Sequence, residues 1–181
     1  IQAVEETSGE VLTFDNKICD ARYSKCCGGA TENFENVWEP EQHPYLTKVV
    51  DNKEIPTDFN LDLKDEMNAE NWIRNTPPAF CNTDDKNILE QVLPGFDRVT
   101  TDFFRWKVEY SQQEIAELLK NRSGIDFGEI VKLEPVERGL SGRLTKLKIS
   151  GTKKTIVVGK ELEIRKWLSK SHLYSSAFVT D

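Results

Sequence analysis

Residues 128–158 read GEIVKLEPVERGLSGRLTKLKISGTKKTIVV, and this stretch decides the fold class. It predicts three strands, at 128–137, 143–149 and 154–158, joined by turns that contain glycine. The strands follow one another without regular helical crossovers, which is typical of an α+β fold rather than a parallel βαβ array. We therefore predict mainly antiparallel strands with a few short helices, in a single domain that allows two lobes.

The flanking sequence adds helices and further strands. Residues 111–114, Ser-Gln-Gln-Glu, form a capping box that opens a helix ending near Gly124. Alternating residues predict a strand over 103–110. A short helix is expected at 161–168 and a last strand at 176–179.

The N-terminal half is expected to be less regular. Residues 10–24 predict a hairpin around the turn formers at 15–16. A short helix is expected from about 63 to 74. Thr83 is expected to cap another helix that continues to residue 93.

Composition restricts the class of protein. Of the 181 residues, 30% are charged and 38% are hydrophobic, as in soluble globular proteins. No apolar run approaches the roughly 18 residues of a membrane-spanning helix, so no transmembrane segment is expected, and no signal peptide opens the chain. Because the chain begins with Ile1 rather than Met, we expect it to be a processed or trimmed piece of a longer protein.

The net charge of −7 is unevenly distributed. Residues 132–170 hold 11 Lys and Arg against 4 Asp and Glu, a net charge of +7, whereas residues 1–131 have a net charge of −13. This asymmetry indicates either an anionic partner for the C-terminal third or attraction between the two halves. A pI near 5 argues against nucleic acid as the partner.

The four cysteines are Cys19, Cys26, Cys27 and Cys81, and they have neither CxxC nor zinc-finger spacing. Cys26 and Cys27 would point to opposite faces of an extended backbone, so their joint ligation of one metal would need a bend. In an oxidising compartment Cys81 can pair with either of them, and free buried thiols are the alternative.

Residues 23–38, YSKCCGGATENFENVW, hold the densest group of candidate binding residues. Gly28 and Gly29 allow a positive φ or a close approach of the backbone to a ligand. The hydroxyl, carboxylate, amide and aromatic side chains that follow are typical of a carbohydrate or peptide groove. A tight turn that leads into a core aromatic is the alternative interpretation.

Familiar catalytic motifs are absent from the sequence, including GxSxG, HExxH, the P-loop and a GxGxxG after a strand. We expect His43 and His172 to have surface or packing roles. Glu32, Glu35 and Glu39 would share a face if helical, which is typical of a solvated acidic surface. Only Glu32, beside the double glycine, is a catalytic candidate.

A second group of candidate residues is Arg138-Gly-Leu-Ser-Gly-Arg143. Its Ser141 and glycine form a turn between two predicted strands, and a guanidinium can bind a carboxylate through two hydrogen bonds. The residues by themselves favour an ordinary hairpin turn with solvated arginines.

Taken in order, these motifs resemble those of the stage II sporulation protein D (SpoIID) family. The family patterns are Ala-Val-x-x-Thr-x-Gly, Tyr-x-x-x-Ser-Gly-Gly-x-Thr-Glu-Asn with a later Val-Trp, Pro-Tyr-Leu, Arg-x-x-Ser-Gly-Arg and Ser-Ser-x-Phe. They match residues 3–9, 23–38, 44–46, 138–143 and 175–178, with Cys27 in place of the usual Ser. The resemblance covers nearly the whole chain and is weakest over 51–100.

The resemblance implies an extracytoplasmic protein, in the periplasm, the cell wall or the space between forespore and mother cell. It implies a lytic transglycosylase that acts on peptidoglycan glycan strands stripped of their stem peptides. A cell-wall amidase is an implied partner. The implied substrate-binding residues are Tyr23, Ser24, Cys27, Gly28, Gly29, Thr31, Glu32, Tyr45, Arg138, Ser141 and Arg143. We expect Trp38 and Phe178 to pack in the core.

The family's catalytic glutamate and its metal-binding His and Cys segment both precede the matched motifs. The chain therefore resembles the C-terminal two-thirds of the domain, from residue 1 to 181, without the N-terminal catalytic segment. We expect it to be inactive alone and to hold no cofactor, with any zinc site upstream. One alternative is a non-catalytic module that binds glycan or stimulates an amidase. Another is a thiol or metal protein built around Cys26 and Cys27.

Overall fold

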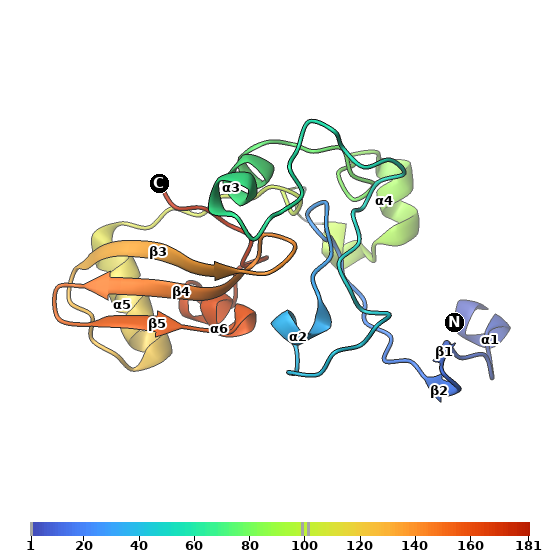
Figure 1. Cartoon of the computed structure of the whole chain (residues 1–181), viewed down its shortest axis with the longest axis horizontal. Coiled ribbons are helices and arrows are strands. Elements are labelled where there is room, and N and C mark those ends of the chain that lie inside the picture. The colour runs from blue at the N-terminus through green and yellow to red at the C-terminus, as the bar shows by residue number, and fades with distance from the viewer. Residues whose placement is uncertain (1, 99, 101) are drawn as a thin grey trace.

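The computed structural model describes residues 2–98, 100 and 102–181, with only the backbone described for Phe96 and Arg98. Its elements are arranged as Figure 1 shows. The helices are α1 (Gln2–Glu6), α2 (Phe34–Val37), α3 (Glu66–Arg74), α4 (Lys86–Val92), the 3₁₀ helix η1 (Gly95–Arg98), α5 (Gln112–Ser123) and α6 (Glu161–Trp167). The strands are β1 (Thr13–Phe14), β2 (Lys17–Ile18), β3 (Ile130–Arg138), β4 (Leu144–Gly151) and β5 (Thr155–Val158).

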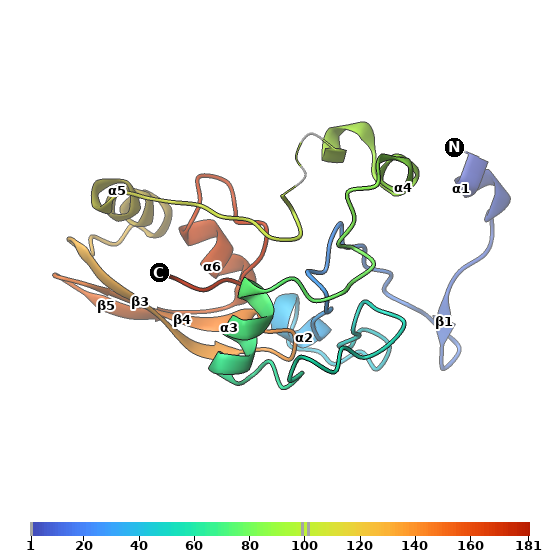
Figure 2. The ribbon, with the colours of Figure 1, turned by 90° about the horizontal axis from the view of Figure 1, so that it is seen from above.

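A three-stranded antiparallel sheet forms one end of the molecule, in the order β3-β4-β5. The three strands predicted between 128 and 158 are therefore confirmed, as is the α+β fold class. Figure 2 shows α5 and α6 on the same side of this sheet. The opposite face and the edges carry exposed side chains such as Val131 and Val157.

The main core lies between the sheet and these two helices. Its buried residues are Ile115, Leu118, Leu119, Phe127, Ile130, Leu144, Leu147, Ile149, Val158, Ile164, Leu168 and Leu173. On α5 the apolar positions at i, i+3 and i+4 share one helix face, and on β4 the alternate positions 147 and 149 share one sheet face. Burial of these side chains supplies the principal stabilisation of this half.

Local signals in the sequence correctly located four helices, α3, α4, α5 and α6. The Ser111 hydroxyl caps α5, Glu114 completes the capping box, and Gly124 ends the helix at φ 74°. Helices α3 and α4 also form, but α4 is capped by Asp85 rather than by Thr83. Thr83 accepts a hydrogen bond from the backbone N–H of Asp85, so it shapes the turn before the helix.

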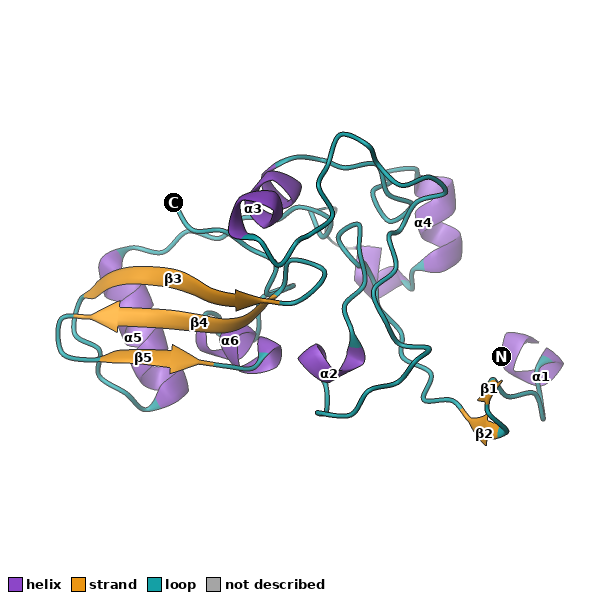
Figure 3. Ribbon diagram, in the orientation of Figure 1, coloured by secondary structure: helices purple, strands orange, loops and turns teal. Residues whose placement is uncertain are grey.

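The other half of the described chain is mostly loops, as Figure 3 shows. Its buried cluster is small and consists of Ala30, Leu63 and Trp72, with Phe59 and Leu61 packed against it. The hairpin predicted at 10–24 shrinks to two residues per strand around Asp15 and Asn16 at positive φ. The side chains of this hairpin are exposed, so no core extends its strands.

The strands predicted at 103–110 and 176–179 are wrong. Residues 103–110 run as bends and irregular chain, and 176–179 run as irregular chain. Residues 176–179 lie beside the sheet through a bond from the Leu144 N–H to the Ser176 carbonyl. An alternating pattern identifies an extended chain, but a strand also needs a continuous ladder of partners.

Candidate functional site

The Glu32 carboxylate lies beneath the turn that joins β3 to β4. Its Oε2 accepts hydrogen bonds from the Ser141 hydroxyl at 2.6 Å and the Ser141 N–H at 3.0 Å. Its Oε1 accepts from the Leu140 N–H at 3.1 Å, the Asn33 N–H at 2.9 Å and the Asn36 amide at 2.9 Å. Two segments more than a hundred residues apart are therefore joined by one carboxylate.

Close approach to this carboxylate requires glycine at position 139. A Cβ atom built on Gly139 would overlap the Glu32 Oε2 atom. Gly142 adopts φ 81°, and its N–H donates to the Gly139 carbonyl at 3.1 Å. The glycines of the turn thus serve its packing and its backbone conformation.

Arg143 joins the same turn to the double-glycine segment. Its guanidinium donates to the Ala30 carbonyl at 3.1 Å, the Cys27 carbonyl at 2.9 Å and the Ser141 hydroxyl at 2.8 Å. A guanidinium has five N–H donors, and these contacts use three of them. The other two N–H groups of Arg143 have no hydrogen-bond partner among the described residues, so they remain for a ligand.

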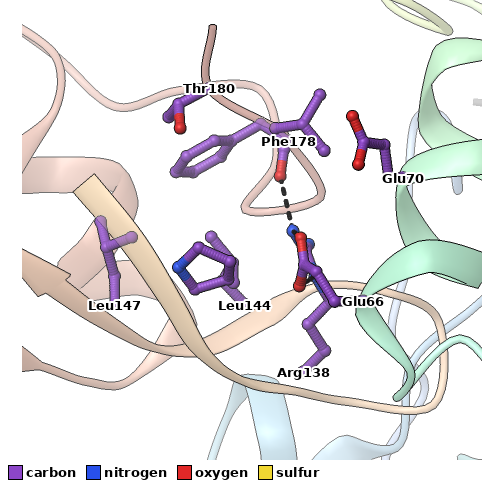
Figure 4. A pocket seen from close by; sticks show the side chains of 9 residues that line it. Glu66, Glu70, Arg138, Leu144, Leu147, Phe178 and Thr180 are labelled. Atoms are coloured by element: carbon purple, nitrogen blue, oxygen red, sulfur yellow. Dashed lines mark hydrogen bonds and ion pairs between the residues drawn. The ribbon is translucent and has the colours of Figure 1, made fainter. Parts of the chain in front are cut away.

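Arg138 is buried at 3% exposure and binds Glu66 of α3 through two hydrogen bonds, of 2.6 and 2.7 Å. It also donates to the carbonyls of Gly142 and Phe178, and Figure 4 shows the bond to Phe178 at a cavity of about 100 Å³. The expectation of solvated arginines at this turn is therefore wrong for Arg138. A distant carboxylate and backbone carbonyls provide the partners that make its burial favourable.

A larger groove, of about 1020 Å³, runs along the boundary between the two halves of the molecule. One wall carries Cys27, Gly28, Ser141 and Arg143 from the sequence-predicted site. The other residues that line it include the rings of Phe103, Phe104, Trp106, Tyr110, Tyr174 and Phe178 and the cations Arg74, Arg105, Lys107 and Lys132. The groove is therefore rich in aromatic rings, and two of its cations, Lys107 and Arg74, pair with the lining carboxylates Glu109 and Asp181.

The remaining predicted binding residues lie outside the lining of this groove. Tyr23 is 73% exposed, and the Tyr45 hydroxyl accepts a bond from the Asp20 N–H. The Thr31 hydroxyl bonds the backbone of Val49 and the Thr47 carbonyl. Ser24 donates to the Cys26 carbonyl, and Gly29 at φ 101° lies against the ring of Trp72.

Of the side chains that were expected to have packing roles, two pack as predicted and one does not. Phe178 packs against the main core as predicted, and His43 packs edge-on against Phe34 with ring centroids 4.5 Å apart. Trp38 is 48% exposed and lies under the Arg22 guanidinium, so its predicted core position is wrong. Trp38 is the C-cap residue of helix α2, which ends at Val37.

Arg105 is the main functional candidate that the sequence reasoning missed. Its guanidinium donates to the carbonyls of Gly28, Trp72, Phe104 and Asn75. Burial lowers the pKa of this group. The sequence feature that came closest to identifying Arg105 was the alternating pattern over 103–110. That pattern predicted a strand, with Arg105 as one of its alternating positions.

The comparisons with known proteins define one family. Residues 32–181 match the model described as Domain of unknown function (DUF8618), and the chain belongs to that family. No curated protein and no solved structure matches the chain. The site includes both matched residues, such as Glu32 and Arg143, and the segment 26–30 that precedes the match.

Within the described ranges, no helix combines the length and the apolar character needed to cross a membrane.

Proposed function

We propose that this chain binds peptidoglycan glycan strands whose stem peptides have been removed, as the substrate-binding part of an extracytoplasmic lytic transglycosylase. The observation that carries the proposal is the groove of about 1020 Å³, lined by aromatic rings and by Arg105 and Arg143. The ordered SpoIID-like motifs support the same substrate.

The chemistry of such a strand suits the groove. Each muramic acid presents a lactyl carboxylate once its peptide is removed, and each sugar ring offers an apolar face. The two remaining donors of Arg143 fit a carboxylate, and the aromatic side chains provide flat surfaces for sugar rings. The hydrogen bonds of Arg105 and Arg143 run to carbonyls and a hydroxyl, so no described carboxylate neutralises either cation.

The groove itself offers a poor general acid among its described lining residues. A lytic transglycosylase needs a carboxylic acid that protonates the glycosidic oxygen and then accepts the proton of the muramic acid C6 hydroxyl. Hydrogen bonds from Lys107 and Arg74 lower the pKa values of Glu109 and Asp181, so both carboxyl groups stay ionised at neutral pH. Glu32 is committed to five hydrogen bonds with the protein.

The proposal therefore places the catalytic acid in sequence outside these 181 residues. The test is a digest of peptide-free glycan strands by this chain and by a longer natural chain extended upstream of Ile1, read by mass spectrometry. Anhydromuramyl products from the longer chain only are expected. Products from this chain alone would contradict the placement of the acid.

A second candidate function is a non-catalytic module that binds glycan or stimulates a cell-wall amidase. The lowered pKa values of the groove carboxylates favour this candidate as far as this chain is concerned. It would replace the enzyme proposal if neither chain cleaved glycan while both bound it. Faster peptide release by an added amidase would then identify the stimulating role.

Glycan binding can be tested with a matched pair of tyrosines. Tyr174 lines the groove and is 53% exposed, whereas Tyr23 is 73% exposed and lies outside the lining. We expect Tyr174→Ala to weaken binding of peptide-free strands about fivefold to tenfold, as for an aromatic contact worth about 1 kcal/mol. Tyr23→Ala should leave it unchanged in the same pull-down or calorimetric titration. Equal losses in both variants would contradict the location of the site in the groove.

A further inference from the structure

Three thiols and a carboxylate gather where the double-glycine segment meets the loop after α3. The Sγ atoms of Cys27 and Cys81 lie 3.5 Å apart. These two atoms and an oxygen of Asp51 all lie within 4.8 Å of one another. Cys26 also approaches this group, with its Sγ atom 4.0 Å from the Cys81 carbonyl oxygen.

The spacing of these atoms suits a shared metal ion. Two sulfur ligands at about 2.3 Å from a tetrahedral zinc ion lie about 3.8 Å apart. A disulfide requires an S–S distance of about 2.05 Å, and all four cysteines of the chain are free thiols in this structure. Sulfur atoms at 3.5 Å are therefore closer to the ligand spacing than to the covalent one.

The backbone already holds the carboxylate in place. The Asp51 Oδ2 atom accepts a hydrogen bond from the Cys81 N–H at 2.8 Å, and the Asp51 N–H donates to the Gly29 carbonyl at 2.9 Å. The Asp51 carbonyl accepts a further bond from the Phe80 N–H at 2.9 Å. Asp51 is thus hydrogen-bonded to both loops that carry the cysteines. Such bonds hold a metal-binding carboxylate in a fixed orientation.

Thiols bind a divalent cation as thiolates, so zinc binding by this group would release the protons of the ligating thiols.

We propose that Cys27, Asp51 and Cys81 bind one zinc ion and that Cys26 supplies the fourth ligand. Thiolate sulfur with one carboxylate oxygen is a ligand set that zinc accepts in tetrahedral geometry. This assignment departs from the expectation of no cofactor in this chain, and it does not depend on the proposed glycan chemistry.

The position of the site gives the ion a structural role. This half of the molecule is built on a small core of Ala30, Leu63 and Trp72, and a zinc ion would crosslink three of its loops. The Cys27 carbonyl is also bound by Arg143 at 2.9 Å. Zinc would therefore fix one wall of the groove as well as the loops.

The test uses the whole chain, purified in a reducing buffer and loaded with zinc alone. We expect one zinc ion per chain and protection of three thiols from a thiol reagent, with Cys19 remaining reactive. Removal of zinc by a chelator should expose all four thiols and lower the melting temperature. The control Cys19→Ser should keep the zinc and show no reactive thiol.

Asp51→Asn should weaken zinc binding about tenfold or more. Cobalt substitution of the unaltered chain provides a second readout, because thiolate-to-cobalt charge transfer and tetrahedral ligand-field bands report the ligands even if the variant fails to fold. A reduced chain that binds no zinc at equimolar concentration would overturn the proposal. So would loss of zinc in Cys19→Ser. Protection of only two thiols would overturn the assignment of Cys26.

Discussion

Replacement of Glu32 by Gln tests whether this side chain holds the β3–β4 turn in place. A glutamine has one acceptor oxygen, so in either orientation its NH₂ group faces at least two of the donors that the carboxylate now satisfies. Hydrogen bonds to a charged group contribute about 1.5–3 kcal/mol each. Because Glu32 is half-buried, water offsets part of this loss, and we expect a destabilisation of about 2–3 kcal/mol.

The assay is urea unfolding of the purified chain followed by circular dichroism. We expect a lower midpoint with an unchanged m-value, and a melting temperature lower by about 4–12 °C. Glu35→Gln is the matched control, because Glu35 accepts its two side-chain bonds on a single oxygen that glutamine retains. The control should change stability by less than about 0.5 kcal/mol.

A Glu32→Gln chain with the same urea midpoint as the wild type would refute this reasoning. If the same substitution in the longer natural chain left stability unchanged and yet abolished glycan cleavage, Glu32 would be the catalytic acid. Loss of stability with cleavage retained at low temperature would assign it the positioning role that its hydrogen bonds indicate.

Further predictions concern the same turn and the helix beside the sheet. Arg138→Lys should lower the unfolding free energy by about 1–2 kcal/mol in urea, because an ammonium cannot reproduce the paired bonds to Glu66; an unchanged midpoint would contradict this. Gly139→Ala should cost about 1–3 kcal/mol in the same assay, since its methyl group would overlap Glu32, and wild-type stability would mean that the turn can move away. Hydrogen bonds from the N-cap serine lower the pKa of Glu114 below its usual 4.5, so their stabilisation is complete above that value and is lost as the pH falls through the lowered pKa. Thermal melts of wild type and Glu114→Gln should therefore differ at pH 7 and converge as the pH falls through the lowered pKa of Glu114, and a constant difference would contradict the prediction.

The two arginines of the β3–β4 turn show how far sequence reasoning reaches at this site. The Arg-x-x-Ser-Gly-Arg pattern correctly identified a turn between two strands. The pattern could not show that Arg138 binds Glu66, 72 residues away, or that Arg143 binds the Cys27 carbonyl, 116 residues away. Those partners come from long-range packing, which no local spacing encodes.

The cysteines show the same difference between what local spacing predicts and what long-range packing decides. Because Cys26 and Cys27 are adjacent, we predicted that their side chains lie on opposite faces, and the resemblance placed metal binding upstream. The structure brings Cys81 and Asp51 to them, because the backbone of residue 51 pairs with both Gly29 and Phe80. A ligand set assembled from three loops has no sequence spacing by which it could be recognised.

The sequence by itself determined the elements whose signals are local. The capping box and left-handed glycine bound α5, the glycine turns separate three strands, and the apolar positions of α5 select the face that enters the core. Each depends on backbone conformations and side-chain periods within a few residues. Tertiary structure alone decided that the extended segments at 103–110 and 176–179 remain without a strand ladder, that Glu32 holds a distant turn, and that aromatic rings and arginines line one groove. These outcomes depend on which distant groups compete for the same hydrogen-bond donors and the same buried surface, and that competition is settled only when the whole chain packs.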